Sequence, residues 1–338
     1  MIKLYSQIAE PIAEGVDGLK SALQTAVELE HATLPPYLYA LYSIRPGTNQ
    51  RLSKIILSIV LEEMLHLALA CNLLNAIGGQ PSLNHPEFIP SYPGPLPGVS
   101  GAIDVPLAPV SKKLIHDVFM EIEKPETPLS YPVKKLFELK LTKPRTIGLF
   151  YQAIKEQLVA SSAQENIFVG KPSRQLGVGL PGLKKVTDLA SAIAAIELIV
   201  EQGEGTSSTP LNALEKPAHY YMFAAAYYGR ELVPQQGEPP FAYAGEEIPF
   251  DEDNIKPLMV NPKPASYLGT PAMDANQQFN RTYTSLLQTL HKTFNGSPMS
   301  IMGSVGIMQQ LKAEAIALGE IQIGQNLFAG PTFTYTPA

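Results

Sequence analysis

The sequence of 338 residues contains no tryptophan and a single cysteine, Cys71. One cysteine excludes an intrachain disulfide, and its place within an apolar stretch is typical of a small core residue rather than a reactive thiol. Only 17% of the residues are charged, the net charge is −6, and there is no run of basic residues that could follow a phosphate backbone. We therefore expect a protein of a reducing compartment that does not bind nucleic acid.

A charged N-terminal segment followed by an apolar core is also missing, and charged residues interrupt the longest apolar runs. These absences indicate a soluble cytoplasmic protein with no membrane partner. The chain is long enough to bury a sizeable core without disulfides. Its 31 prolines lie mostly in residues 81–109 and 234–271, which we expect to form loops between the helices of a mainly α protein.

The stretch IVLEEMLH at residues 59–66 lies within an apolar segment that predicts a buried helix over residues 50–77. The inward stripe of this helix carries Glu63 and His66, three residues apart. A metal ion would satisfy both buried groups, and Glu-x-x-His is how di-iron and di-manganese bundles build their sites. A Glu–His hydrogen bond without metal is the alternative. Glu62 is expected outside the coordination sphere, although the pattern leaves the reverse choice open.

A second apolar pattern predicts a helix over residues 17–44, with Glu30 on its inward stripe. The short link between the two helices makes them antiparallel neighbours, so that Glu30 and the carboxylate of the next helix can meet. Pro35 and Pro36 remove two backbone donors, which should kink the helix or leave carbonyls unpaired. Glu30 is therefore a candidate metal ligand, and a hydrogen bond to a tyrosine is the alternative.

Residues 80–145 are too long for a turn and read as the long crossover of a helical bundle. The proline- and aromatic-rich part from Pro90 to Pro97 is expected to fold over the metal site as a lid and to shape an apolar pocket. Tyr92 should reach furthest inward, beside Phe88 and Leu96.

Two more core helices are predicted, from about residue 144 to 164 and across residues 186–205. Glu156 borders the apolar side of the third helix and is a candidate ligand, with a solvent-facing glutamate as the alternative. Glu201 lies in a stack of glutamates on one face of the fourth helix, and such a stack is repulsive unless a cation lies between its members. The nearest imidazole in sequence is His219. The other glutamates of the stack are Glu197 and Glu204.

Several stretches, in this order, resemble the ferritin-like domain of the iminophenyl-pyruvate dimer synthase type, which occurs in violacein- and staurosporine-like pigment pathways and in stand-alone bacterial proteins. They are LEHATLPPYLYALYSI at 29–44, EEMLHLALACNLLNAIGG at 62–79, PSYPGPLPG at 90–98, MEIEKPE at 120–126, VEQGEG at 200–205, HYYMF at 219–223 and the closing AGPTFTY at 329–335.

This resemblance implies a four-helix ferritin-like bundle with a metal centre. Because the expected second Glu-x-x-His is replaced by a histidine after the fourth helix, the resemblance leaves open whether one ion or two are bound. Matched position by position, it implies as ligands Glu30, Glu63, His66, Glu156 and Glu201, with His219 close by.

We divide the chain into a ferritin-like metal-binding bundle, residues 15–232, and a segment of residues 233–338 with two helices that pack on it, at about 272–294 and 299–318. The expected function is that of an oxidoreductase in which iron, as one ion or two, activates oxygen or peroxide and oxidises a small amino-acid-derived substrate. Manganese and zinc are the other candidate metals. A binding or storage protein and a metal-free structural bundle are the alternatives, and a homo-oligomer is compatible with all three.

Overall fold

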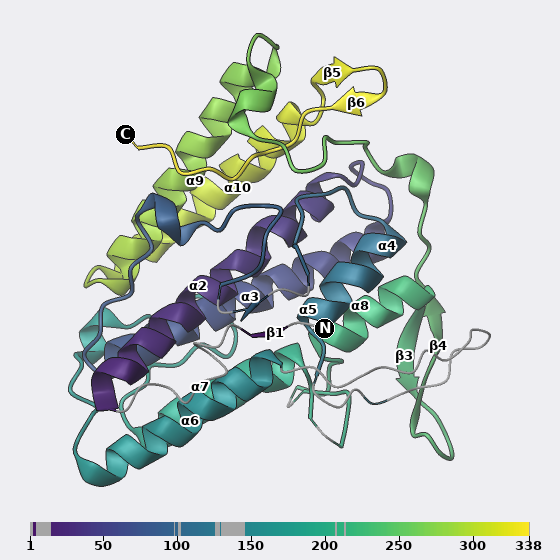
Figure 1. The fold of residues 1–338 in the computed structure, drawn as a ribbon. Helices are drawn as coiled ribbons and strands as arrows, with labels where there is room; N and C mark the ends of the chain where they lie inside the picture. The colour runs from purple at the N-terminus through teal and green to yellow at the C-terminus, as the bar shows by residue number, and fades with distance from the viewer. Residues whose placement is uncertain are drawn as a thin grey trace.

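The computed structural model describes residues 3–4, 15–97, 99–100, 103–125, 129, 146–206, 208–212 and 214–337. Over these residues the chain is mainly helical, which confirms the predicted fold class, and two long helices occupy the centre (Figure 1). Residues 130–145 lie outside the described residues; they include the end of the predicted crossover and the expected start of the third helix at 144.

Helices α2 (Gly15–Tyr42) and α3 (Gln50–Ala76) form the central antiparallel pair. Their buried residues follow the three- and four-residue spacing expected from the sequence, with Leu19, Leu23 and Ala26 among those on α2. Helix α3 ends where Gly78 adopts a φ of 79°, which a residue with a side chain rarely adopts, and Gly79 N–H donates to Leu74 O at 2.9 Å. The predicted helices therefore begin and end within two residues of the observed ones.

Helix α3 has the length and mean hydropathy, 27 residues and 1.7, of a helix that can cross a membrane. In this fold, however, it contacts other helices along its length, and 67% of its most apolar window is buried inside the protein. Its hydropathy is therefore that of the central helix of the bundle.

One face of the central pair is covered by α6 (Ile147–Gln164) and α7 (Leu189–Gly203), which complete a four-helix bundle. Helix α8 (His219–Tyr228) also packs on α3. Beside α8 lies a short helical stretch made of α4 (Lys112–Leu114), a π-helical turn (Ile115–Phe119) and α5 (Met120–Ile122). This stretch and α8 bring two segments that are distant in sequence to one end of the bundle.

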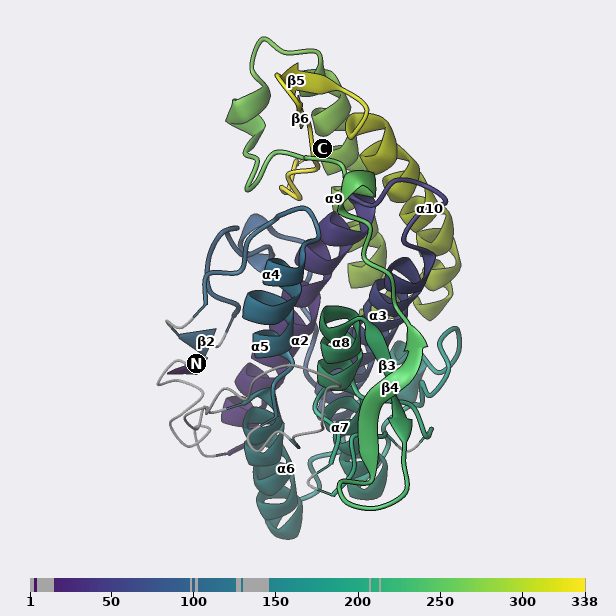
Figure 2. The same cartoon turned by 90° about the vertical axis from the view of Figure 1, so that its right-hand side faces the viewer.

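The opposite face of the central pair is covered by the hairpin of α9 (Ala272–Phe294) and α10 (Ile301–Leu318), as Figures 1 and 2 show. Within the described ranges, three small antiparallel pairs of strands lie at the periphery: β1 (Lys3–Leu4) with β2 (Val99–Ser100), β3 (Arg230–Pro234) with β4 (Phe241–Glu247), and β5 (Gln322–Gly324) with β6 (Leu327–Phe328). Short 3₁₀ turns occur at Pro86–Phe88, Pro172–Arg174, Glu252–Asn254, Pro264–Tyr267 and Pro298–Ser300.

The two prolines of α2 leave the helix continuous but remove the N–H groups that would bond the carbonyls four residues earlier. For Pro36 that carbonyl belongs to Ala32, and the Tyr92 hydroxyl donates to it at 2.7 Å. A side chain of the crossover thus replaces the missing backbone donor, so the Ala32 carbonyl is paired, whereas the sequence predicted either a kink or unpaired carbonyls.

The C-terminal residues run along α9 as a strap. The side chains of Asn276, Asn280 and Thr284, spaced one turn apart on α9, accept from the backbone N–H groups of Thr332, Thr334 and Thr336 at 3.2, 3.0 and 2.9 Å. At the start of the strap, Gly330 exchanges two hydrogen bonds with the Tyr267 hydroxyl, at 2.7 and 2.9 Å. A Cβ atom at Gly330 would overlap the Tyr39 hydroxyl of α2, so only glycine fits there.

Candidate metal centre

Five buried side chains from four segments meet near the middle of α2 and α3, where α6 begins and α7 ends. Glu30 comes from α2, Glu63 and His66 from α3, Glu123 from the residue after α5, and His219 from the first position of α8. None of them is more than 5% exposed. Three carboxylates in such a small volume require positive charge close by, because water cannot solvate them.

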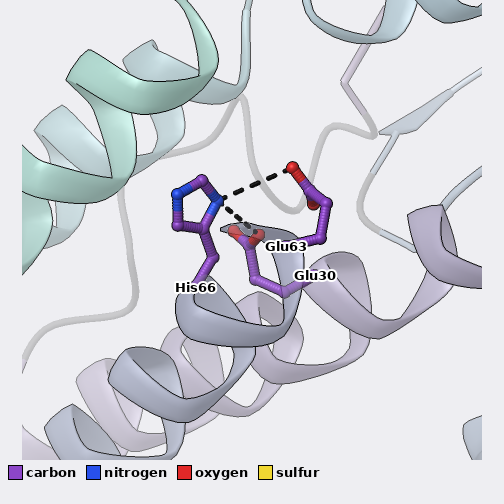
Figure 3. A group of neighbouring side chains, drawn as sticks. All are labelled: Glu30, Glu63 and His66. Carbon is purple, nitrogen blue, oxygen red and sulfur yellow. Dashed lines mark ion pairs between the residues drawn. The ribbon is translucent and has the colours of Figure 1, made fainter. Parts of the chain in front are cut away.

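The first group consists of Glu30, Glu63 and His66 (Figure 3). The Nδ1 atom of His66 lies 3.5 Å from Oε2 of Glu30 and 3.6 Å from Oε1 of Glu63. One atom from each residue lies within 4.8 Å of the others, so a single ion can contact all three. This is the group that the stripes of α2 and α3 predicted.

The second group consists of Glu63, Glu123 and His219. Nδ1 of His219 lies 3.0 Å from Oε1 of Glu63 and 3.5 Å from Oε2 of Glu123. Glu63 therefore belongs to both groups, and the imidazole rings of His66 and His219 stack with their centroids 5.5 Å apart. The two histidine–carboxylate groups share one glutamate and therefore form two adjacent candidate metal sites.

Both imidazoles turn the same nitrogen, Nδ1, toward the shared glutamate. On the other side of each ring, Nε2 of His66 lies 3.0 Å from Oε1 of Gln202, and Nε2 of His219 lies 3.0 Å from Oε2 of Glu62. Each acceptor favours the tautomer with hydrogen on Nε2, which leaves the Nδ1 lone pair for a metal. Nδ1 of His219 is buried and, despite its short distance to Glu63, has no partner in hydrogen-bonding geometry.

The carboxylates are held by hydroxyl donors. Tyr151 of α6 donates to Oε1 of Glu30 and Tyr37 of α2 donates to Oε1 of Glu123, each at 2.5 Å. Thr33 donates to Oε2 of Glu63 at 2.8 Å. In each glutamate the other oxygen faces a histidine, so the hydrogen bonds fix the orientation of the carboxylate without blocking the ligand atom.

Electrostatics in the centre favour bound positive charge. Burial raises the pKa of the Glu63 carboxyl, and the charge of Glu123 raises it further. Burial alone would lower the pKa of His66, but contact with Glu30 and the charge of Glu63 raise it above its ordinary value. For His219 burial acts in the same direction, and Glu123 with its neighbouring carboxylates holds the pKa well above the ordinary value. The surrounding carboxylates therefore favour positive charge at this centre, which a bound metal ion would supply.

A small cavity of about 20 Å³ adjoins the first group. It is lined by Glu30, Glu63, His66 and Glu123 on one side and by the first turn of α6 and the last turn of α7 on the other. The volume accommodates roughly one water-sized molecule. Apart from the ligand atoms, the walls are largely aliphatic and include Ile122, Ile199 and Val200.

The structure does not bring Glu156 or Glu201 into either group. Glu156 is exposed and accepts from the Gln152 side chain at 2.9 Å, because the buried stripe of α6 passes through Tyr151, Ile154 and Leu158 instead. Glu201 is half-buried, and the next residue along α7, Gln202, is the one that points into the centre. The helices α6 and α7 thus supply hydrogen-bonding groups rather than ligands.

Glu123 was not predicted from the sequence pattern. It follows the short helix α5, which continues a π-helical turn where the regular spacing of an α-helix does not apply, and Lys124 and Pro125 come directly after it. The signal that could have found it is the stretch MEIEKPE, which carries part of the family resemblance. Glu62, left open by the sequence, lies behind His219 and orients its ring.

The predicted lid is wrong in its position. Tyr92 is buried and its hydroxyl bonds Ala32 O, while Phe88 packs on the ring of His31 at 4.4 Å between centroids. Ala32 points to the side of α2 opposite Glu30, because two residues turn a helix by about 200°. Residues 90–97 therefore cover a different flank of α2, and none of them lines the cavity beside the carboxylates.

The donor set of the centre, carboxylate oxygens and imidazole nitrogens, suits iron, manganese and zinc. The orphaned Nδ1 of His219, the fixed tautomers and the shared glutamate all fit a bound ion. These buried groups can hold metal ions, although the donor set alone does not select one metal.

Comparison with known proteins agrees with the helical fold. A solved structure of a ferritin-like protein from Caulobacter vibrioides shares 21% identity with this chain, covers 94% of it and 97% of its own length, and superposes with a TM-score of 0.60. At this identity the likeness shows the fold alone. A search of curated proteins gives no match. The sequence profile described as Ferritin-like matches residues 23–228, which include both histidine–carboxylate groups. The chain therefore belongs to the ferritin-like family.

Proposed function

We propose that this protein is a metal-dependent oxidoreductase of the iminophenyl-pyruvate dimer synthase type, which oxidises a small amino-acid-derived substrate at a centre of two ions. The observation that carries the proposal is the pair of buried histidine–carboxylate groups sharing Glu63. The shared glutamate supports two adjacent ions, since one carboxylate can offer an oxygen to each.

The charge of the surroundings also supports two ions. Four carboxylates contact the imidazoles of the centre: Glu30, Glu63, Glu123 and Glu62, the last with a side chain 15% exposed. Two divalent cations would balance these four negative charges and leave both histidines neutral. A single divalent ion would leave two carboxylates to be compensated by protons.

Iron is the metal we propose, and when bound it supplies the activation of dioxygen or peroxide. In the proposed site His66 with Glu30 would hold one ion, His219 with Glu123 the other, and Glu63 would contact both. The protein itself orients these groups through Gln202, Glu62, Tyr37, Tyr151 and Thr33.

The cavity beside the candidate ligands has the size for a small oxidant, and its apolar walls suit the approach of an apolar substrate. Its volume of about 20 Å³ suits a molecule the size of dioxygen, while its aliphatic walls exclude bulk water. The outer wall includes Gly148 of α6 and Glu204, the residue after α7, and Gly148 N–H donates to Glu204 Oε1 at 2.7 Å. We place the approach of the substrate at this junction of the two helix ends.

The test is aerobic turnover by protein reconstituted with ferrous iron. The substrate is the imine formed in solution from phenylpyruvate and ammonia, and substrate loss and oxygen uptake are followed together. Parent protein is expected to consume both, Glu123→Gln is expected to lose most of the activity, and Glu156→Gln, which removes an exposed carboxylate outside the centre, is the matched control. Oxygen uptake without substrate loss, with many irons oxidised per chain, would instead identify a storage protein.

A further inference from the structure

A second and much larger cavity, about 350 Å³, lies between the α2/α3 pair and the α9/α10 hairpin. It is on the opposite side of the central helices from the metal centre, since α3 turns Met64 and Leu67 toward it and Glu63 and His66 away from it. Cavities that bind small molecules typically measure about 300–1,000 Å³. The size of this one is therefore that of a ligand site.

Aliphatic side chains from four helices line this cavity. Leu34 and Leu38 come from α2, Leu67 from α3, Leu287 and Leu290 from α9, and Leu311 from α10. Among them Leu287 is fully buried and Leu67 is 3% exposed, so the cavity reaches deep between the helices. At its mouth Leu61 and Met302 are 46% and 69% exposed. A slender aliphatic chain matches these walls better than a flat or charged molecule.

At the inner end the wall includes His31 and Tyr283, whose hydroxyl lies 2.7 Å from Nε2 of His31. If the tyrosine O–H donates to Nε2, the hydrogen of the neutral imidazole is on Nδ1. The reverse arrangement would leave both the tyrosine hydrogen and Nδ1 of the same imidazole without a partner. A doubly protonated ring would carry hydrogen on Nδ1 as well. Nδ1 is therefore a hydrogen-bond donor in both the neutral and the protonated ring.

Nδ1 of His31 is buried and has no hydrogen-bond partner among the described residues. A buried N–H without an acceptor destabilises the folded protein, because the hydrogen bond that it made to water in the unfolded chain is not replaced. A ligand oxygen that accepts this hydrogen would satisfy the buried group, and His31 is one of the residues that line the cavity.

We propose that this cavity binds an elongated aliphatic molecule with a carbonyl-type oxygen, the chain lying between the α2/α3 pair and the α9/α10 hairpin and the oxygen accepting from Nδ1 of His31. A second copy of the protein is a poorer occupant, because it could cover only the exposed residues at the mouth, such as Met302 and Val305, and would not reach Leu287 or His31.

The test is equilibrium dialysis of the purified full-length protein against methyl decanoate, quantified by gas chromatography. Parent protein is expected to bind the ester saturably, with one molecule per chain. Met308→Trp fills the cavity from its half-exposed side and should weaken binding at least about tenfold, since the bulky ring takes the place of the chain. Met299→Trp is the matched control, because Met299 lies at the start of the same hairpin arm, is 74% exposed and does not line the cavity.

Decane tests the role of the oxygen. Without an acceptor for His31 it should bind about two- to tenfold more weakly than the ester, the range of one net hydrogen bond. Absence of saturable ester binding by the parent, or equal binding by Met308→Trp, would overturn the proposal. Equal affinity for decane would overturn the assignment of His31. If light scattering instead finds a dimer that Met302→Glu dissociates, and the ester does not bind, the mouth is a self-association surface and the proposal fails.

Discussion

Because Glu63 belongs to both histidine–carboxylate groups, replacing it should change the metal content of the whole centre. Glu63→Gln keeps the size of the side chain and an acceptor for Thr33, but it replaces the one carboxylate that belongs to both groups. We therefore expect this variant to lose both ions, whereas Glu30→Gln and Glu123→Gln each alter one group only.

The size of the effect follows from linkage between binding and folding. At a free metal concentration about 100 times the dissociation constant, each bound ion stabilises the folded protein by about 2.7 kcal/mol. For a domain of 150–250 residues each kcal/mol raises Tm by roughly 2–4 °C, so ferrous iron should raise the Tm of the parent by roughly 5–10 °C per ion, and by somewhat less in a longer chain. The same addition should leave the Tm of Glu63→Gln nearly unchanged.

The assay combines elemental mass spectrometry of dialysed protein with anaerobic thermal melts, with and without ferrous iron. Glu156→Gln serves as the control, because it removes a glutamate of the same bundle that is exposed to solvent. If Glu63→Gln retains as much metal as the parent, or if iron raises its Tm by the same amount, the reasoning that places Glu63 between two ions is refuted.

Three further changes test the surroundings of the centre and the packing of the chain. Gln202→Leu removes the acceptor behind one imidazole and should weaken metal binding about 10- to 100-fold in chelator competition; an unchanged affinity would contradict that role. Tyr92→Phe leaves the Ala32 carbonyl without its donor and should lower the free energy of unfolding in urea by about 1–3 kcal/mol, with metal content preserved. Gly330→Ala should displace the C-terminal strap and lose two hydrogen bonds, which lowers the free energy of unfolding by about 1–3 kcal/mol. Gly303→Ala, in open space on α10, should raise the free energy of unfolding by about 0.5–1 kcal/mol. Equal effects at the two glycines would show that a side chain at residue 330 does not clash with Tyr39.

The sequence predicted the central helices well because their burial is periodic. Glu30, Glu63 and His66 interrupt otherwise apolar stripes, and a polar residue at a core position is a strong signal. The spacing of residues determines which side chains lie on the inward face of a long helix. It therefore also indicated that Glu30 of α2 and Glu63 of α3 meet.

The rest of the centre could not be derived in that way. On α7 the choice between Glu201 and Gln202 depends on a rotation of about 100°, which is set by packing against α3 and not by the local pattern. Glu123 lies after a π-helical turn, and its position depends on how that stretch packs beside α8. Hydrogen bonds between residues 86 to 157 positions apart are decided by the whole fold, so periodicity within one segment carries no information about them.

The strap along α9 behaves as a molecular ruler. Three side chains one turn apart on α9 meet alternate amide groups of the strap, and between the first two of these groups lies Phe333, whose φ of 47° departs from extended backbone. One residue inserted between Gly330 and Thr336 would move each later N–H group of the strap out of register with its acceptor on α9. The length of this last segment is therefore fixed by the helix that it follows, to a single residue.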